Sequence, residues 1–175
     1  MTNVVESIRK ISEEKSNFIF LQKGIVSSIE DYKVIGCTLW SDIELEAYYK
    51  MNDRNHIIIN GQKLEHNDLI KMYKEDKIWL ENNVDSNTIV MTHHLPSFSL
   101  IHSDYKKEEL KIYNTGYASN LDAVLYRAKM WIYGHTHKSS DQIFDNITRC
   151  ICNPYGYYNN DDKHSGFTTR SFCLE

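Results

Sequence analysis

The sequence predicts an α/β domain in which mixed β-sheets are flanked by helices, and two features of the chain carry this prediction. Segments with apolar residues at helical spacing alternate with short apolar runs of strand length. Two of these runs, residues 88–91 and 130–133, lead directly into histidine clusters. Side chains that follow strands in this way gather at the carboxyl edge of an α/β sheet, where active sites form. We expect a single domain over residues 1–175, because neither a repeat nor a linker interrupts the alternation.

The first third of the chain predicts one helix and three strands. Residues 2–15 carry apolar positions at helical spacing, with Thr2 as a candidate N-cap. Residues 18–21, 25–29 and 32–39 are short apolar runs separated by Lys-Gly and Glu-Asp pairs, which favour turns. Residues 41–61 predict a loop with a candidate strand at 56–59.

The rest of the chain continues the alternation. A helix is expected at 67–82, a strand at 88–92, a short helix at 120–127 and a strand that ends at His135. Residues 96–116 are polar and predict no regular element, and loops of this length are usually functional lids or mobile. Residues 142–151 predict one or two strands with a turn at Asp145-Asn146. Residues 155–165 are expected to be ordered only in part.

Composition narrows the function classes. The net charge of −4, with eight neutral histidines, argues against a general nucleic-acid binder held by basic patches. The chain contains no apolar stretch approaching the length of a membrane span, and its first residues do not resemble a signal peptide. Cys37 sits in an apolar strand and is interpreted as a buried free thiol. Together these features predict a cytoplasmic protein.

The two histidine clusters are the most informative features of the chain. The first is Thr-His-His-Leu-Pro at 92–96, and the second is Gly-His-Thr-His at 134–137. In extended backbone, His135 and His137 would point to one side because they are two residues apart. Neutral imidazole is the commonest protein ligand for zinc, iron and similar metals. The clusters therefore predict a metal site.

These clusters resemble the last two motifs of the calcineurin-like metallophosphoesterases. Segments 36–43, 117–122 and 152–154 resemble further family segments in the expected order, so the likeness spans roughly residues 15 to 160. The resemblance implies part of a four-layer αββα sandwich. It also implies two divalent metal ions (Mn, Fe or Zn) that polarise the phosphoryl group of a phosphate mono- or diester.

The family's first metal-binding motifs are missing from this chain. Those motifs are Asp-x-His, Gly-Asp-x-x-Asp and Gly-Asn-His. The literal match Asp162-Lys163-His164 follows a turn-like segment instead of an apolar strand, Asn55-His56 lacks the preceding glycine, and no Gly-Asp pair occurs. The chain is therefore interpreted as the carboxyl-terminal half of the family domain.

The resemblance assigns roles to four histidines. It implies that His93 and His135 bind one metal and that His137 binds the other. His94 is a candidate catalytic residue that either contacts substrate or orients His93. Because neutral imidazoles alone hold two dications poorly, we expect the chain by itself to bind at most one metal, loosely, at His93 and His135. Hydrolysis by the isolated chain should then be very weak or absent.

Several other residues are expected to have lesser roles. Asn120 and Asp122 are expected to cap the short helix, and His102 is expected to be a solvated loop residue in preference to a substrate contact. Tyr155 stands where relatives carry an arginine, which puts an anion contact near Asn153 in doubt. The remaining candidates are interpreted as structural or solvent-exposed side chains: His56, His66, His164, Lys71, Lys74 and Lys77.

Three functional hypotheses follow. In the first, this is a metallophosphoesterase-family chain whose activity requires a separate or deleted amino-terminal half. In the second, it is a non-catalytic remnant that acts as a binding or assembly module. In the third, His135, His137, Cys150 and Cys152 form a structural zinc site, although Cys150 and Cys152 also fit a plain core strand. The missing half would leave an apolar sheet edge exposed, so we also predict self-association.

Overall fold

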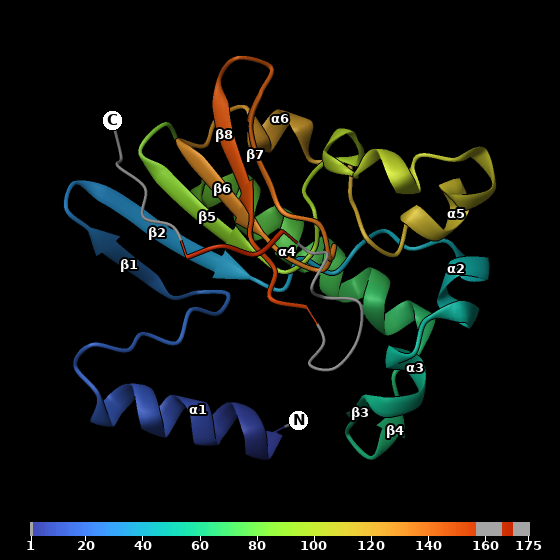
Figure 1. The fold of residues 1–175 in the computed structure, drawn as a ribbon. Helices are drawn as coiled ribbons and strands as arrows, with labels where there is room; N and C mark the ends of the chain where they lie inside the picture. Colours follow the sequence, from blue (N-terminus) through green and yellow to red (C-terminus); the bar gives the residue numbers. More distant parts are fainter. Residues whose placement is uncertain (1, 157–165, 170–175) are drawn as a thin grey trace.

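A six-stranded mixed sheet forms the centre of the molecule in the computed structural model, which describes residues 2–156 and 166–169 (Figure 1). The strands are β1 (Val26–Ile29), β2 (Tyr32–Cys37), β5 (Thr88–Thr92), β6 (Met130–Tyr133), β8 (Thr148–Cys152) and β7 (Ser140–Phe144), in that spatial order. The four central strands are parallel, and an antiparallel strand lies at each edge. The predicted α/β class with a mixed sheet is therefore confirmed.

The register of the parallel strands positions the histidine clusters. Cys37 pairs with Thr92 at the carboxyl ends of β2 and β5, and Met91 pairs with Ile132 near the ends of β5 and β6. The loops after these three strands therefore start at the same edge of the sheet. This is the arrangement that the two histidine clusters predicted.

Alternation along the strands divides the core into two faces. On the first face, Val90, Trp131 and Cys150 belong to the main apolar cluster. On the second face, Ile89, Met130 and Ile151 belong to a smaller cluster. Strands with apolar residues on both faces are expected where helices or loops cover a parallel sheet.

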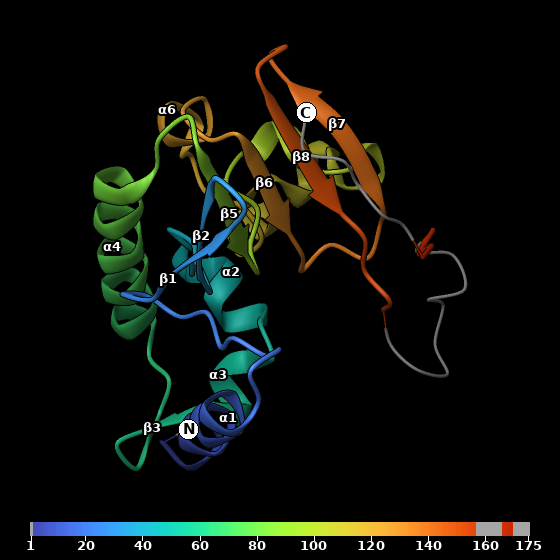
Figure 2. The same cartoon turned by 90° about the vertical axis from the view of Figure 1, so that its left-hand side faces the viewer.

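The long helix α4 (His66–Asn83) covers the first face (Figure 2). It begins at a capping box, in which the Glu65 side chain accepts from the backbone N–H of Asp68 and the Asp68 carboxylate accepts from that of Glu65. Its buried side follows helical spacing with Leu69, Tyr73 and Leu80. The short helix α6 (Asp122–Leu125) adds Val124 and Leu125 to the same cluster.

The remaining elements are short or peripheral. Helix α1 (Thr2–Glu14) lies apart from the sheet in both ribbon views (Figures 1 and 2). The other elements are α2 (Leu45–Lys50), α3 (Asp53–His56), α5 (Lys111–Asn114), the pair β3 (Ile58–Ile59) and β4 (Gln62–Lys63), and three single 3-10 turns at Phe98–Leu100, Ser103–Tyr105 and Glu108–Leu110. None of the helices among the described residues is long and apolar enough to cross a membrane.

Three predicted segments differ from the structure. Residues 18–21 form no strand, because they pair with no neighbouring strand in the described part of the chain. The segment 41–61 holds α2, α3 and β3, so the strand expected at 56–59 is reduced to two residues. The segment 96–116 contains single helical turns, one of which begins where the Ser97 hydroxyl accepts from the Ser99 backbone N–H. Most of the tail at 155–165, together with the side chain of Thr2, lies outside the described residues.

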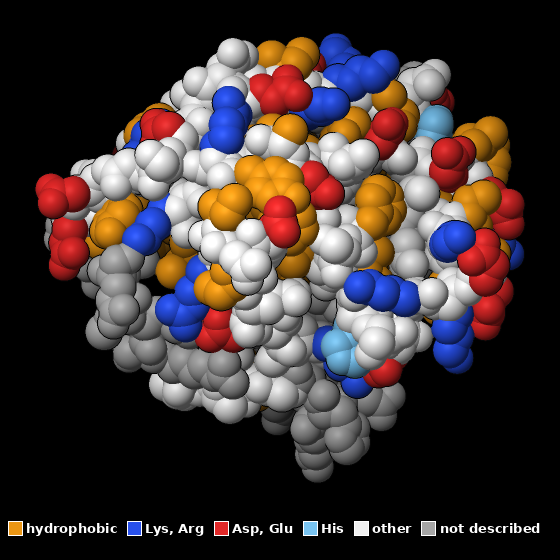
Figure 3. All heavy atoms as spheres, turned by 90° about the horizontal axis from the view of Figure 1, so that it is seen from above, with side chains coloured by type: hydrophobic (Ala, Val, Ile, Leu, Met, Phe, Trp, Pro, Cys, Tyr) orange, Lys and Arg blue, Asp and Glu red, His pale blue; other side chains and the backbone are white. Residues whose placement is uncertain are grey.

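The surface seen from above carries interspersed charges (Figure 3). Basic and acidic side chains alternate over this view, and apolar side chains form small patches between them.

Candidate functional site

Two neighbouring parallel strands deliver the histidine clusters to one place. His93 follows β5 directly, and His135 follows the end of β6 after one glycine. The backbone N–H of Gly134 donates to the carbonyl oxygen of His93 over 3.0 Å, which joins the two loops beyond the strands. This hydrogen bond fixes the backbones of the two loops relative to each other.

The rings of His93 and His135 are in direct contact. His93 Nε2 and His135 Nδ1 are 2.9 Å apart, and the two ring planes are nearly perpendicular at 81°. In the neutral pair, one nitrogen donates a proton and the other accepts it. The structure therefore brings together the two residues assigned to one metal.

A backbone turn at His135 produces this contact. His135 has a φ of +62°, in the left-handed region that side chains other than glycine rarely adopt. The Thr136 backbone N–H donates to the Gly134 carbonyl over 2.7 Å, which closes a tight turn after β6. The expectation that His135 and His137 share one side because the backbone is extended is therefore wrong. Strain of this kind is concentrated at functional sites.

His94 is buried and packs against the ring of His135. Its side chain is 2% exposed, and its Nδ1 lies 3.4 Å from the carbonyl oxygen of Thr38. The His94 ring is 4.4 Å from the His135 ring and 5.4 Å from the Trp40 ring, measured between centroids. This burial favours the positioning role over contact with a substrate.

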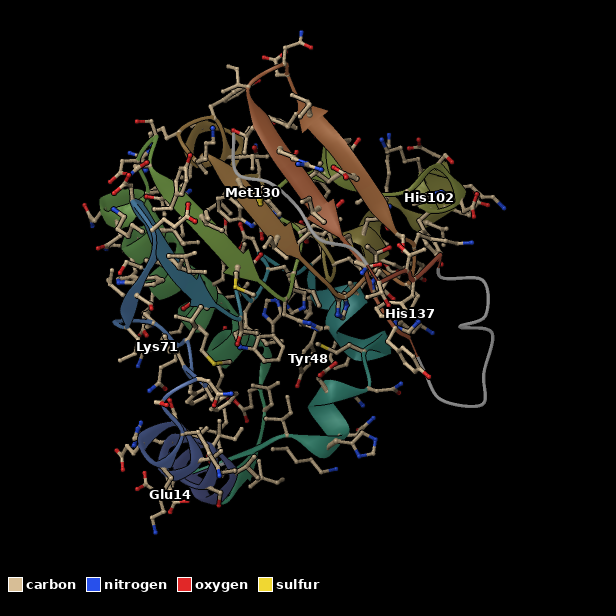
Figure 4. All side chains as sticks on the ribbon, turned by 60° about the vertical axis from the view of Figure 1, so that its left-hand side comes forward. Glu14, Tyr48, Lys71, His102, Met130 and His137 are labelled. Atoms are coloured by element: carbon tan, nitrogen blue, oxygen red, sulfur yellow. The ribbon has the colours of Figure 1, made fainter. Side chains whose placement is uncertain are left out.

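His137 lies on the same loop, two residues beyond the contacting pair (Figure 4). It is half-buried. Burial is the largest cause of the lowered pKa of His93 and of His135, and electrostatic interaction with His137 lowers both further. The third metal-ligand candidate therefore lies within electrostatic reach of the first two.

Burial lowers the pKa of three imidazoles in the site. Burial lowers the pKa of His93, against the opposing charge of Asp53, and burial lowers that of His94 well below its ordinary value. Burial, followed by the charges of His93 and His137, lowers the pKa of His135 to about 4. Near pH 7 these three rings are therefore unprotonated, which is the form that binds metal ions.

Thr38, Thr92 and Trp131 hold the loops in place through hydrogen bonds that no sequence pattern indicates. The Thr38 carbonyl accepts from the backbone N–H groups of both His93 and His94 over 3.2 Å. The Trp131 indole donates to the Thr92 hydroxyl over 2.9 Å, and this hydroxyl donates to the His94 carbonyl over 2.8 Å. The resulting relay of hydrogen bonds links the strands β5 and β6 to the histidine backbone.

Asp76 holds the loop that carries Thr38. Its carboxylate accepts from the backbone N–H of Leu39 over 3.0 Å, and Leu39 itself has a φ of +54°. Burial raises the pKa of Asp76, although the charge of Lys23, 3.5 Å away, opposes the shift. A sequence signal for this role exists, because Asp76 occupies the buried stripe of α4 between Tyr73 and Leu80.

The two cysteines of the zinc alternative are part of the main apolar cluster. Cys150 and Cys152 are buried beside Trp131 and Tyr133, and burial raises the pKa of each thiol to about 12. Cys152 Sγ lies 3.8 Å from the Thr136 carbonyl oxygen, and Cys150 Sγ lies 3.7 Å from that of Thr148. These positions favour the core-strand interpretation.

The remaining candidates are structural, peripheral or outside the described residues. The His66 ring lies 2.7 Å from the Ile43 carbonyl, which fits its structural interpretation, and His56 is exposed. The predicted caps at Asn120 and Asp122 are wrong, because the N-cap of α6 is Leu121 and it makes no side-chain cap bond. Tyr155 is exposed and makes an edge-to-face contact with the ring of Phe167. The segment Asp162-Lys163-His164 lies outside the described residues.

The described residues form no complete metal site. Over 2–156 and 166–169, no group of three or more His, Cys, Asp or Glu side chains is arranged so that it could hold a metal ion. What the site does provide is two imidazole nitrogens in contact, with a third imidazole nearby.

Comparisons with known proteins give one relative and no function. No family model matches the chain, and no solved structure matches it. The chain is 28% identical over 184 residues to the "Uncharacterized protein L509" of Acanthamoeba polyphaga mimivirus. This similarity covers 88% of the chain and 64% of the viral protein, so the chain spans less than two thirds of its relative's length.

Proposed function

We propose that this chain supplies the histidine side of a calcineurin-like metallophosphoesterase site. In this proposal the six-stranded sheet corresponds to one of the two sheets of an αββα sandwich. The proposal is supported by the histidine motifs at the carboxyl ends of adjacent parallel strands and by the neutral state of the rings. His93 and His135 would hold a divalent ion (Mn, Fe or Zn), and His137 would face a second.

The contact between His93 and His135 is the observation that carries the proposal. Their facing nitrogens are 2.9 Å apart. Two nitrogens bound to one octahedral ion at about 2.1 Å, and at right angles to each other, would be separated by about 3 Å. The spacing of the two nitrogens therefore suits one such ion, and its binding would turn each ring so that the lone pair points at the ion instead of at the other nitrogen. His94 packs against His135 and limits the rotation of that ring.

The same geometry limits the activity that we propose for the isolated chain. A bound ion would polarise a phosphoryl oxygen and lower the pKa of its water. Two imidazoles alone would hold such an ion loosely. A dinuclear site would in addition need carboxylates to offset the repulsion between its two cations. We therefore propose that another chain or segment supplies the carboxylates, and that hydrolysis of phosphate esters by this chain alone is very weak or absent.

The deciding experiment measures metal per chain by elemental mass spectrometry after dialysis against manganese, zinc and iron. We expect one ion or less per wild-type chain, and its loss in His93→Ala. The matched control is His56→Ala, which removes an exposed histidine of α3 and should leave the metal content unchanged. Retention of metal in His93→Ala would contradict the assignment. Two tightly held ions that both depend on His93 would instead indicate a complete hydrolase.

A second measurement separates the alternatives. The segment of the viral relative outside the matched region is added in trans, and hydrolysis of a chromogenic phosphodiester is followed. Recovery of activity that depends on His93 supports a divided enzyme, whereas inactivity with metal still bound favours a non-catalytic binding module. Zinc that is lost on changing both Cys150→Ser and Cys152→Ser, and retained in His93→Ala, would favour the structural zinc site.

A further inference from the structure

A single peptide group, the one between Thr38 and Leu39, joins helix α4 to the histidine loop after β5. Because this peptide bond is trans, its N–H and its carbonyl oxygen point in opposite directions. The Leu39 N–H donates to the Asp76 carboxylate of α4 over 3.0 Å. On the other side, the Thr38 carbonyl oxygen accepts from the backbone N–H groups of His93 and His94, each over 3.2 Å. Asp76 and the histidine loop are therefore connected through one rigid plane.

The same carbonyl oxygen contacts one of the three rings of His93, His94 and His135, which together form the histidine centre. His94 Nδ1 lies 3.4 Å from the Thr38 carbonyl oxygen. Since this oxygen can only accept, the neutral His94 ring carries its proton on Nδ1 and leaves Nε2 as an acceptor. The His94 ring in turn packs against the ring of His135. The orientation of one peptide group therefore affects both the backbone and the rings of the histidine centre.

The conformation of Leu39 requires an external contact to hold this peptide group. Leu39 is fully buried and has a φ of +54°, in the left-handed region that is unfavourable for a residue with a Cβ atom. Such a conformation persists only where surrounding contacts determine it. The hydrogen bond from the Leu39 N–H to Asp76 is a contact of this kind, because it fixes the peptide plane at its strained residue.

Burial and charge make Asp76 a strong acceptor. Its side chain is 6% exposed, and its second carboxylate oxygen lies 3.5 Å from Lys23 Nζ. Burial raises the pKa of Asp76, whereas Lys23 and the backbone N–H groups of Leu39 and Trp40 act in the opposite direction. A hydrogen bond accepted by an ionised group is about twice as strong as one between neutral groups. It also polarises the peptide group that donates it, so the Thr38 carbonyl becomes a better acceptor for the histidine N–H groups.

We infer that Asp76 is a positioning residue of the histidine centre, which acts through the Thr38–Leu39 peptide group to hold the backbones of His93 and His94. Its effect on metal affinity rests on the proposed function, whereas its effect on the histidine backbone does not. Residues that orient metal ligands without binding the ion typically change the metal affinity by about 10–100-fold when they are replaced. The inference therefore has one readout without metal and one with metal.

Amide hydrogen exchange in the metal-free protein, followed by NMR, is the first readout. In Asp76→Leu, the backbone N–H groups of His93 and His94 should exchange at least about tenfold faster relative to the N–H of Val90, in the centre of β5. A general loss of stability would instead accelerate all three to the same extent. Asp76→Asn keeps an amide oxygen that can accept from Leu39, so its effect should be smaller.

Asp85→Asn is the matched control. The Asp85 carboxylate also accepts from a backbone N–H, that of Asn87 over 3.0 Å, and it pairs with Lys33. Asp85 precedes β5, however, and so lies at the other end of the strand from the histidines. Asp85→Asn should therefore lower the overall stability without changing the relative exchange of the histidine N–H groups.

Metal affinity, measured by calorimetric titration with Zn²⁺, is the second readout. Asp76→Leu should bind at least about tenfold more weakly than the wild type, Asp76→Asn should lie between the two, and Asp85→Asn should bind as the wild type does. A wild-type chain whose zinc binding does not change in His93→Ala would contradict the proposed function, and hydrogen exchange would still decide this inference. Equal acceleration at His93, His94 and Val90 in Asp76→Leu would overturn it. If Asp76→Leu does not fold, Asp76→Asn takes its place, and equal effects of Asp76→Asn and Asp85→Asn on the histidine N–H groups would overturn it.

Discussion

At the scale of single residues, the backbone of His135 decides the geometry of the candidate site. Its left-handed φ of +62° turns the ring toward His93, and the Gly134 hydrogen bond to the His93 carbonyl stabilises that turn. Asparagine adopts this region more readily than most residues. His135→Asn therefore removes the imidazole while keeping the backbone conformation, whereas His135→Ala would disturb both.

The lowered pKa of His135 predicts a loss of stability in acid. Its folded pKa of about 4 lies below the ordinary value of 6.5, so the unfolded chain binds more protons between these values. The free energy of unfolding should therefore fall as the pH drops from about 6.5 to about 4. In His135→Asn this fall should be smaller by about 2 kcal/mol. Urea denaturation at pH 7.5 and pH 4.5 measures the difference.

The exposed His56 provides the matched control for this prediction. His56→Asn changes the same side chain at the surface of α3, so its acid-induced fall in stability should equal that of the wild type. If His135→Asn lost as much stability in acid as the wild type, the neutral state of His135 would not be linked to folding. The interpretation of the imidazole pair as a neutral metal-binding pair would then lose its electrostatic support.

At the scale of elements, the strands next to the site could be predicted from sequence, whereas the loops could not. The strand expected at 88–92 has these bounds in the structure, whereas the strand expected to end at His135 ends two residues earlier, at Tyr133. The 96–116 segment forms single turns that depend on local side-chain caps and on packing against the sheet. Such turns leave no periodic pattern, so a prediction from periodicity passes over them.

The contact between the two clusters was predictable only in part. That His93 and His135 follow adjacent parallel strands was expected from their order in the chain, and the strand pairing bears this out. The left-handed turn at His135 was not expected, because nothing in a Gly-His-Thr-His segment marks which residue adopts it. The partner of Asp76 could not be predicted for another reason, because that partner, the Leu39 backbone N–H, lies on a loop far away in the sequence and no pattern in the helix indicates this contact.

The close packing of β2 against β5 gives a prediction at Gly36. A Cβ at this position would lie 2.8 Å from the backbone carbonyl oxygen of Met91, which cannot move without disturbing the sheet. Gly36→Ala should therefore lower the free energy of unfolding by about 1–3 kcal/mol. Urea denaturation followed by tryptophan fluorescence measures the change, since Trp131 is fully buried.

Gly134 is the matched glycine for comparison. A Cβ there would meet its nearest atom, His93 Nδ1, at 3.4 Å, which is an ordinary contact. Gly134→Ala should therefore change stability by less than about 1 kcal/mol, and in the stabilising direction if restriction of the unfolded chain dominates. Equal destabilisation by Gly36→Ala and Gly134→Ala would contradict this prediction. The effect at Gly36 would then not come from the close Met91 carbonyl oxygen of β5.

At the scale of the whole molecule, the sheet presents apolar side chains on its second face. Met91 is 41% exposed on β5, and it shares this face with the cluster of Val34, Ile89, Met130 and Ile151. By their pairing with Tyr32 and Arg149, Ile29 and Ile143 lie on the same face at the two edge strands, and they are 55% and 56% exposed. Exposed apolar positions on a sheet with open edges favour pairing with another chain.

We therefore predict that the protein self-associates through this face and its edges, and Ile143 offers the sharpest test. A lysine on an edge strand blocks pairing by introducing a charge that association would have to bury. Sedimentation equilibrium over a range of concentrations should show a dimer for the wild type and at least about tenfold weaker association for Ile143→Lys.

The matched control is Ile78→Lys. It places the same charge on the exposed side of α4 and should associate as the wild type does. A wild-type chain that stays monomeric at all concentrations, or an equal effect of both substitutions, would contradict the prediction. Association that persists in Ile143→Lys but is abolished by Met91→Lys would place the contact on the sheet face and not on its edge.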